Sequence, residues 1–412
     1  MTMNTNEGAD RVVLVVNCGS TTIKFQAIRT ASRVSIVSGG VDRIGRSDCR
    51  GYIRQEGLDG KRGEKQEEAL PSATHGGALA WMFKVLPKGM PLHALGHRVV
   101  HGGSYFSEAA PANEDTLRKI EECIPLAPLH NPVELAGIRE CMALHPEVPH
   151  FVSFDTAFHQ NKPELTATFP LPKEMRETYG YRKFGFHGAS HRYVAQRAAA
   201  LMGKALGELK LVTCHLGGGS SITAVKGGIA WDTTATFGTC TGMPMGTRSG
   251  DIDLGVVLDL LTSKGKSAQE VSDLVYKESG LLALSGASAD MAELERLEEQ
   301  GHEGARLARD YYAYTLKRFI GSFAAAMDGL DGIVFTAGIG ENDGALREKV
   351  CRDLAWLGVR FDAEKNKLRG AETLISGADS AVAVLVIPTN EELAIALEVA
   401  ELLDRGRATV HS

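Results

Sequence analysis

The hydrophobic pattern of the chain predicts strands that are first paired in hairpins and later separated by helices. Apolar runs of strand length occupy residues 12–16, 23–28, 34–37, 94–100, 151–154, 211–216, 222–225, 333–336 and 381–387. A chain that begins with paired strands and continues with alternating strands and helices is typical of an α/β fold with mixed sheets.

Three helices are predicted between these strands. Residues 304–327 place apolar side chains at helical spacing over a long stretch. A second helix is predicted at 114–124 behind Asn113, and a third at 391–403 behind Asn390, because asparagine is a good N-cap.

One sequence pattern occurs twice, about half the chain apart. Residues 14–25 (LVVNCGSTTIKF) resemble residues 211–225 (LVTCHLGGGSSITAV), and both are expected to form strand, Gly/Ser/Thr turn and strand. The first turn carries an amide, hydroxyls and the ammonium group of Lys24, which suit a phosphate or a metal–phosphate. The echo suggests two related domains, each opening with a hairpin whose turn approaches a ligand. The alternative is that both are ordinary Gly-Ser turns.

Composition restricts the classes of protein that need to be considered. A chain of 412 residues is expected to form two or three domains, and its net charge of −6 argues against nucleic acid or an anionic membrane surface as the main partner. The seven scattered cysteines favour a reducing, cytoplasmic setting. The polar start of the chain has no signal-peptide pattern, no run approaches a membrane span, and residues 57–65 are expected to form a polar loop.

Two arginines lie in turns flanked by glycine. Arg98 lies in GHRVVHGG at the end of a predicted strand, and Arg248 lies in the loop MGTRSGDID. A guanidinium group binds carboxylate or phosphate oxygens in pairs, so these positions suit an anion that is transferred between acceptors. Two surface salt bridges are the alternative.

Histidines and an aspartate supply further candidates. FGFHGASH places His187 and His191 four residues apart, which is metal-ligand spacing on a helix, but no third ligand is evident and the neighbouring glycines place His187 in a turn. An imidazole that points into a cleft is the favoured interpretation, with a structural histidine as the alternative. His130 in APLHNP and Asp155 in SFDTAFH adjoin apolar runs, where polar side chains often face a cleft.

Nucleotide and metal candidates are less distinctive. The stretch GIGEN, residues 338–342, is expected to be a glycine turn after a strand that approaches a nucleotide, but the chain has neither a GxGxxG fingerprint there nor a P-loop. Asn17 and Glu391 each offer an oxygen to Mg²⁺, which uses few protein ligands. Glu391 is equally well explained as a carboxylate in the first turn of a helix.

These motifs together resemble a known family. NCGSTTIKF, GHRVVHGG, APLHNP, FDTAFH, YGYRKFGFHGASH, HLGGGSSI, MGTRSGDID, FTAGIGEN and PTNEE occur in the order and spacing of the acetate kinases, over nearly the whole chain. The resemblance implies the acetate and sugar kinase/Hsc70/actin fold, in which two duplicated RNase H-like domains flank a nucleotide cleft. It implies an N-terminal domain at 1–155, completed by the C-terminal helix 391–412, and a nucleotide-binding and dimerisation domain at 156–390.

The resemblance also implies a reaction and its residues. Acetate and ATP give acetyl phosphate and ADP, with Mg²⁺ (or Mn²⁺), in a cytoplasmic homodimer. Arg98 and Arg248 hold the carboxylate and the phosphoryl group, and His187 hydrogen-bonds the phosphoryl oxygens. Asp155 orients an arginine or the metal–phosphate assembly. The remaining implied positions are His130 in the same site, Val100, Leu129, Phe186 and Thr239 at the acyl pocket, Asn17 and Glu391 at magnesium, and Ser20, Thr22, Lys24, His215, Gly217, Gly218, Gly219, Gly338, Ile339, Gly340 and Asn342 at the nucleotide.

The chain departs from the family pattern near both substrates. Gly218 stands where the family commonly has asparagine, Ser104 where it has glutamate, and Thr239 where it has a pocket-lining proline. Cys240, Thr241 and Pro244 are also unusual. Three alternatives therefore stay open: a kinase for propionate or another short-chain acid, since one methylene changes selectivity by only ~1–3 kcal/mol; a kinase linked to pyrophosphate; and a non-kinase ATPase switch of the same fold.

Overall fold

The computed structural model describes residues 10–56 and 63–410, and it separates into two compact units. Unit 1 is residues 1–160 with 390–412, and unit 2 is residues 161–389. Residues 57–62 of the polar loop predicted at 57–65 lie outside the described residues, as does the start of the chain at 1–9. In the described part, no helix is both long and apolar enough to cross a membrane.

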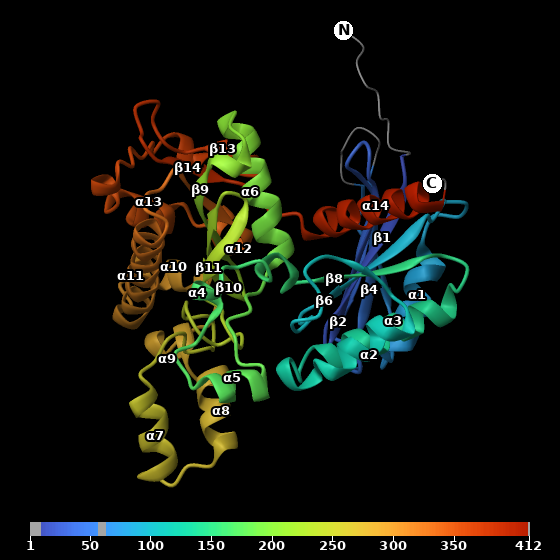
Figure 1. The fold of residues 1–412 in the computed structure, drawn as a ribbon, viewed down its shortest axis with the longest axis horizontal. Coiled ribbons are helices and arrows are strands. Elements are labelled where there is room, and N and C mark those ends of the chain that lie inside the picture. Colours follow the sequence, from blue (N-terminus) through green and yellow to red (C-terminus); the bar gives the residue numbers. More distant parts are fainter. Residues whose placement is uncertain (1–9, 57–62, 411–412) are drawn as a thin grey trace. The chain divides into compact units, whose positions relative to one another are not determined.

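Unit 1 is built on an eight-stranded sheet in the order β5-β4-β3-β2-β1-β6-β8-β7 (Figure 1). Its helices cover both faces, with α14 on one and α1, α2 and α3 on the other (Figure 1). The strands are β1 (Val12–Cys18), β2 (Thr22–Arg29), β3 (Val34–Asp42), β4 (Arg50–Gln55), β5 (Gln66–Ala69), β6 (Ala94–Val99), β7 (Ala110–Pro111) and β8 (His150–Phe154). The helices are α1 (His75–Val85), α2 (Glu114–Glu122), α3 (Asn131–Leu144) and α14 (Glu391–Val410).

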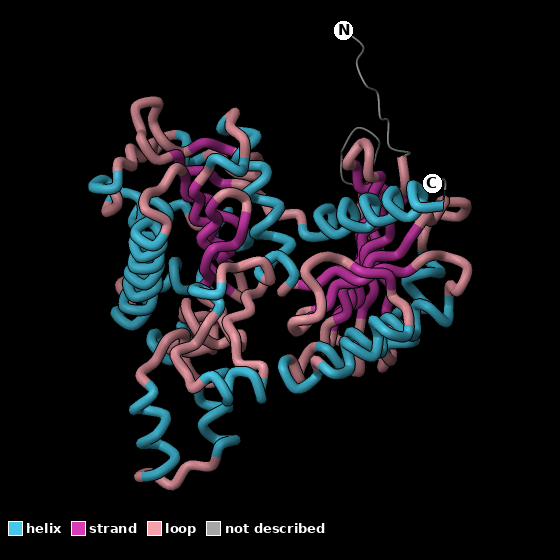
Figure 2. The backbone as a smooth tube through the Cα atoms, in the orientation of Figure 1, coloured by secondary structure: helices cyan, strands magenta, loops and turns pink. Residues whose placement is uncertain are grey.

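Unit 2 is built on a six-stranded sheet in the order β11-β10-β9-β12-β14-β13. Figure 2 shows the strands of both units in magenta. Its strands are β9 (Lys210–Leu216), β10 (Ser220–Lys226), β11 (Ile229–Thr233), β12 (Gly332–Thr336), β13 (Thr373–Leu374) and β14 (Ala383–Val386). The helices are α4 (Glu164–Ala167), α5 (Lys173–Tyr179), α6 (Gly188–Met202), α7 (Leu254–Thr262), α8 (Ala268–Lys277), α9 (Gly280–Ser285), α10 (Met291–Glu299), α11 (Glu303–Ala326), α12 (Ala337–Asn342) and α13 (Gly344–Arg352).

The two sheets repeat one topology. In unit 1, β3-β2-β1 are antiparallel neighbours and β6 and β8 continue in parallel; in unit 2, β11-β10-β9 are antiparallel and β12 and β14 continue in parallel. Both predicted hairpins are confirmed, with Cys18 opposite Ile23 in the first and Leu216 opposite Ser220 in the second. The segment that is repeated in the sequence therefore has the same structure in both units.

The central strands of each unit are buried, which explains their near-continuous apolar runs. Val12 to Val16 in β1 and Ile333 to Phe335 in β12 are at most 1% exposed. Such strands have layers on both faces, so alternation is lost and runs of valine and isoleucine remain. The core strands are therefore the elements that the hydrophobic pattern predicted best.

One predicted element is wrong. The GIGEN segment does not form a glycine turn after β12 but the short helix α12. Thr336 is extended, Ala337 takes a left-handed conformation with φ of 64°, and the helix begins there. Glycines disfavour a helix by about 1 kcal/mol each, but the fully buried guanidinium of Arg347 on α13 holds the carbonyl of Gly340 at 2.8 Å.

Candidate functional site

Arg98 and Asp155 form the centre of the candidate site in unit 1. Arg98 lies near the end of β6 and Asp155 directly follows β8, and these two strands are parallel neighbours. Arg98 Nε donates to Asp155 Oδ1 at 2.9 Å, and Nη2 donates to Oδ2 at 2.6 Å. Asp155 is 4% exposed. The bidentate pair fixes the plane of the guanidinium group at the carboxyl edge of the sheet, where ligands bind in open α/β sheets.

Two further oxygens lie against the same guanidinium group. Arg98 Nη1 makes a long hydrogen bond of 3.4 Å to Asn17 Oδ1 at the end of β1, and Nε lies 3.9 Å from Glu391 Oε2 in the first turn of α14. Burial alone lowers the pKa of Arg98, but Asp155 and Glu391 raise it more, so the arginine stays charged. Burial also raises the pKa of Glu391, against the opposite effect of Arg98. The weakly held Nη1 edge is where an anion oxygen can bind.

The first hairpin presents its polar groups on one side of this arginine. Lys24 is exposed on β2 directly opposite Asn17 in the register, and Ser20 and Thr22 lie in the turn and at the start of β2. His75 at the start of α1 holds the turn, because its Nε2 is 2.9 Å from the carbonyl oxygen of Gly19. A helix thus fixes the turn that the sequence had assigned to a phosphate.

The predicted acyl-pocket residues have different environments. Val100 is buried directly after β6, Leu129 is 68% exposed, and His130 precedes α3 as its N-cap residue without a side-chain cap. Phe186 is buried in unit 2. Each unit therefore contributes predicted residues, and the acyl pocket itself stays a prediction.

Histidines and hydroxyls form one hydrogen-bonded network in unit 2. His187 takes a left-handed conformation, with φ of 56°, directly before α6. Its Nδ1 is 2.9 Å from Ser221 Oγ, and the same hydroxyl lies 2.7 Å from His191 Nε2. His191 Nδ1 is 2.7 Å from Thr213 Oγ1, which donates to the carbonyl of Thr223. A bulky residue in this backbone conformation costs of order 1 kcal/mol or more and is enriched at functional sites.

The Ser221 hydroxyl lies between His187 Nδ1 and His191 Nε2 and joins the two rings. Since the Thr213 hydroxyl donates to the carbonyl of Thr223, its oxygen accepts from His191 Nδ1. His215, which stacks on His187 with centroids 4.2 Å apart, bonds Ser190 Oγ at 2.8 Å. The four-residue spacing of His187 and His191 thus reflects a shared serine.

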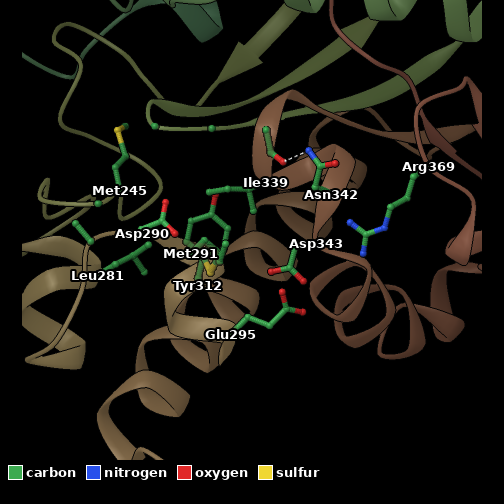
Figure 3. Close-up of a pocket in the computed structure, with 16 residues that line it drawn as sticks. Met245, Leu281, Asp290, Met291, Glu295, Tyr312, Ile339, Asn342, Asp343 and Arg369 are labelled. Carbon is green, nitrogen blue, oxygen red and sulfur yellow. Dashed lines mark hydrogen bonds between the residues drawn. The ribbon is translucent and has the colours of Figure 1, made fainter. Parts of the chain in front are cut away.

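A cavity of about 360 Å³ lies in unit 2 and is lined by five of the eleven predicted nucleotide residues (Figure 3). It is lined by Gly217 and Gly218 of the second hairpin and by Gly338, Ile339 and Asn342 of α12. Gly219 lies against His187 instead, and Gly340 is a buried residue of α12 itself. The volume and the largely apolar wall suit the base and ribose of a nucleotide.

Several cavity residues were missed by the sequence analysis, which had no signal for them beyond the long helix α11. Tyr312 of α11 is fully buried, and its hydroxyl lies 3.0 Å from Ser220 Oγ at the second hairpin. Asp343 caps α13 and accepts from the buried Arg309 at 2.7 Å. Around them lie Met245, Gly246, Leu281, Ala289, Asp290, Met291, Ala292, Glu295 and Arg369 (Figure 3).

Arg248 is held in the loop between β11 and α7. Its Nη1 donates to the carbonyl of Thr239 at 3.0 Å and lies 3.6 Å from Met245 Sδ. The structure thus brings together Arg248 and Thr239, which the sequence had assigned to the phosphoryl group and the acyl pocket. Gly280, with φ of +66°, allows the close approach, since a Cβ there would lie 2.1 Å from the Met245 carbonyl.

The metal candidates are few. Among the described residues, no group of three or more His, Cys, Asp or Glu side chains is arranged to hold an ion. Asn17 and Glu391 remain the oxygen donors beside Arg98.

Comparison with known proteins decides the family. Residues 12–397 match the model of the acetokinase family. The chain belongs to the acetokinase family. It is 44% identical over 399 residues to the acetate kinase of Carboxydothermus hydrogenoformans, a match that covers 95% of this chain and 99% of that protein. Acetokinases are phosphotransferases with a carboxyl group as acceptor, and they use ATP and ADP.

Solved structures support the same conclusion about the fold. The acetate kinase of Porphyromonas gingivalis superimposes with a TM-score of 0.88 at 39% identity, over 95% of this chain and all of that one. A propionate kinase from Francisella tularensis subsp. tularensis SCHU S4 also reaches 0.88, at 37% identity, over 94% of this chain and 98% of that one. The predicted duplicated, actin-like fold is therefore confirmed.

Proposed function

We propose that this acetokinase transfers the γ-phosphoryl group of ATP to acetate, reversibly, to give acetyl phosphate and ADP. The observation that carries the proposal is the pairing of Arg98 with the buried Asp155 at the edge of the unit 1 sheet. The guanidinium group is charged, held flat and free at one edge for an anion. Such positioning and charge stabilisation are what phosphoryl transfer requires of a protein.

The other roles are assigned from the resemblance and supported by the geometry. We assign Arg98 and Arg248 to the acetate carboxylate and the phosphoryl group, and His187 to the phosphoryl oxygens. Asp155 orients Arg98. The cavity of unit 2 takes the nucleotide, with Tyr312 and Ile339 against its apolar part.

The site in unit 1 fits a magnesium ion. Asn17 and Glu391 would hold it through their side-chain oxygens, which suit Mg²⁺ because this ion keeps several waters and uses few protein ligands; Mn²⁺ has the same preference for oxygen. When bound, the ion neutralises phosphate charge. Lys24, opposite Asn17, adds a further positive charge toward a phosphate.

Two wider properties belong to the same proposal. We assign unit 1 as the N-terminal RNase H-like domain completed by α14, and unit 2 as the nucleotide-binding and dimerisation domain of a cytoplasmic homodimer. Helix α7 supports the dimer, since none of its residues is buried within this chain and Leu254, Leu258 and Leu261, which share one face of the helix, are 76%, 59% and 37% exposed. Contiguous exposed apolar surface of this kind marks association sites.

The test is an initial-rate matrix of acetate, propionate and butyrate against ATP, GTP and pyrophosphate with Mg²⁺, with the acyl phosphate trapped as hydroxamate. We expect the highest kcat/KM with acetate and ATP. A preference for propionate would redirect the proposal to the activity named for the Francisella relative. A preference for pyrophosphate would indicate that Gly218, in place of the family's asparagine, has changed the phosphoryl donor. ATP turnover without any acyl phosphate would overturn the kinase in favour of a switch ATPase.

A further inference from the structure

Glu134 is a buried carboxyl group beside Arg98 that has no role in the function proposed above. It lies in the first turn of α3 and is 3% exposed. First-turn acids of helices are ordinarily solvated, where they interact with the helix dipole. A glutamate is almost never fully buried unless it has a partner. The side chain therefore needs an explanation from the groups around it.

The carboxyl group holds the chain where it leaves the sheet after β6. The backbone N–H of Val100 donates to Glu134 Oε2 at 3.0 Å. One residue further along, Asn131 of the same helical turn accepts from His101 N at 3.2 Å and donates to His101 O at 2.9 Å. The start of α3 thus fixes residues 100 and 101, directly after β6, through side chains rather than through a neighbouring strand.

This hydrogen bond does not require an acid. An amide oxygen accepts from a backbone N–H in the same way, and Asn131 does so for the adjacent residue. A carboxyl group differs from an amide in one respect, which is that it changes its charge by gaining or losing a proton. The reason for an acid at this position must therefore involve charge.

The charged and titratable groups that face Glu134 are those of the site. They are Arg98 of β6, Asp155 after β8 and Cys18 of β1. Burial raises the pKa of Glu134 to about 7; Arg98 and the Val100 N–H oppose the rise, and Asp155 adds to it. Arg98 already faces the carboxylates of Asp155 and Glu391. A bound anion would bring one more negative charge to this arginine, which already faces two carboxylates.

We propose that Glu134 is a positioning residue that holds the end of β6 through Val100 and takes up one proton from solvent when an anionic substrate binds at Arg98. The proposal rests on the proposed function, because the anion is the carboxylate substrate. Protonation leaves the hydrogen bond from Val100 in place, since the carbonyl oxygen of a carboxylic acid still accepts. The binding of an anion is thus compensated by the loss of the negative charge of Glu134.

Proton uptake and anion binding are thermodynamically linked, so the proposal predicts how acetate binding depends on pH. If binding of the anion favours the protonated carboxyl group, a rise in pH must weaken binding by the same coupling. The KM for acetate should increase as pH rises above about 7, by up to about tenfold per pH unit for one proton. Simple carboxylic acids are fully ionised in this range, so the slope does not come from the substrate.

The experiment measures kcat and the KM for acetate between pH 6 and 9 at saturating ATP and Mg²⁺, for the full chain. We compare the parent enzyme, Glu134→Gln, which keeps an acceptor for Val100, and Glu140→Gln, an exposed glutamate on the same helix. We expect the rise in KM in the parent and in the Glu140 variant. In Glu134→Gln the KM should vary less than about twofold, while kcat near pH 6.5 stays within a few-fold of the parent.

Two results would overturn the proposal while leaving the kinase function intact: a KM for acetate that does not depend on pH in the parent, or an unchanged slope in Glu134→Gln. Absence of acetyl phosphate at every pH would instead contradict the proposed function. If Glu134→Gln does not fold, a second measurement on the parent decides. Acetate adjusted to pH 7.5 is added to weakly buffered enzyme with an indicator dye, and saturable uptake of up to one proton per chain is expected; no uptake would refute the proposal.

Discussion

Lys162 is a buried lysine next to the segment that carries His187, and its burial lowers the stability of the fold. It is 6% exposed, and its side-chain nitrogen donates to the carbonyl of Phe184, three residues before His187. Burial lowers the pKa of Lys162 to about 7; Asp232 opposes the shift and Arg182 and Lys183 add to it. The lysine thus anchors the loop that carries His187.

Replacing Lys162 should change how stability depends on pH. Between about pH 7 and 10.5 the unfolded chain holds this proton and the folded chain does not, so the parent gains stability as pH rises through that window. Lys162→Met has no such proton. The difference in Tm, variant minus parent, should therefore fall steadily from pH 7 to 9.5 in thermal unfolding. The exposed Lys204→Met is the control, and a difference that stays constant would contradict the buried, neutral lysine.

Gly218 tests whether the missing asparagine matters for the phosphoryl donor. A side chain at this position has room, because a Cβ there meets no atom within 4 Å, and the backbone φ of Gly218 is not positive. Gly218→Asn should lower the KM for ATP about two- to tenfold, the effect of one hydrogen bond worth about 0.5–1.5 kcal/mol. The KM for acetate should not change.

The outcome of the Gly218 experiment separates two donors. An unchanged or raised KM for ATP, measured in the same initial-rate assay, would show that the cavity of unit 2 does not use this position for the nucleotide. If the parent also reacted faster with pyrophosphate than with ATP, Gly218 would be explained as a feature of a pyrophosphate-linked kinase.

At the scale of elements, the pattern along the chain predicted the buried strands and missed the edges. β4, β5, β7, β11 and β13 were not predicted, and all of these except β4 are edge strands. All four residues of β5 are exposed, and alanine is its one apolar residue. An edge strand takes its structure from hydrogen bonds to its neighbour rather than from its own hydrophobicity. The helix predicted at 114–124 ends earlier, at Glu122, because Pro125 follows within a short 3₁₀ turn.

Helix α9 offers a matched test of how an element positions Arg248. Gly280 begins the helix and Gly286 ends it, and both have left-handed φ angles, +66° and +64°. A Cβ on Gly280 would lie 2.5 Å from the carbonyl oxygen of Arg248, whereas one on Gly286 meets nothing within 4 Å. Alanine at either position carries a similar backbone cost, of about 1–2 kcal/mol.

Only the first substitution should therefore impair catalysis. Gly280→Ala must displace the Arg248 loop, and a shift of about 1 Å can cost on the order of 10²-fold in rate. We expect kcat/KM to fall by about that factor in Gly280→Ala, while Gly286→Ala keeps most of its activity. Equal losses in the two variants, at matched Tm, would show that Arg248 does not depend on this contact.

At the scale of the whole molecule, we predict a homodimer whose interface contains the exposed apolar face of α7. The double variant Leu254→Glu with Leu258→Glu places two charges on this exposed helix. Light scattering should give twice the 44.2 kDa chain mass for the parent and one chain mass for the variant. Leu165→Glu, at a residue that is 83% exposed on α4, is the control and should stay dimeric. A parent that is already monomeric would refute the assignment of α7.

The sequence by itself determined what depends on local pattern. The two hairpins, the buried strands and the capped helices follow from short runs of apolar residues, glycines and N-caps, and the motifs in register determined the family. Arg98 and Asp155 were found because strand ends are visible in the sequence, and the structure joins them in one bidentate pair.

Only the tertiary structure decided what depends on neighbours that are distant along the chain. Glu134 and Lys162 look like ordinary surface charges in the sequence, and they become buried because α3 packs on the end of β6 and because residue 162 lies under the carbonyl of Phe184. GIGEN is helical because Arg347 holds it, and the cavity of unit 2 needs Tyr312 from a helix almost a hundred residues after its hairpin. Burial and the sign of the surrounding charge are properties of packing, so a linear pattern does not contain them.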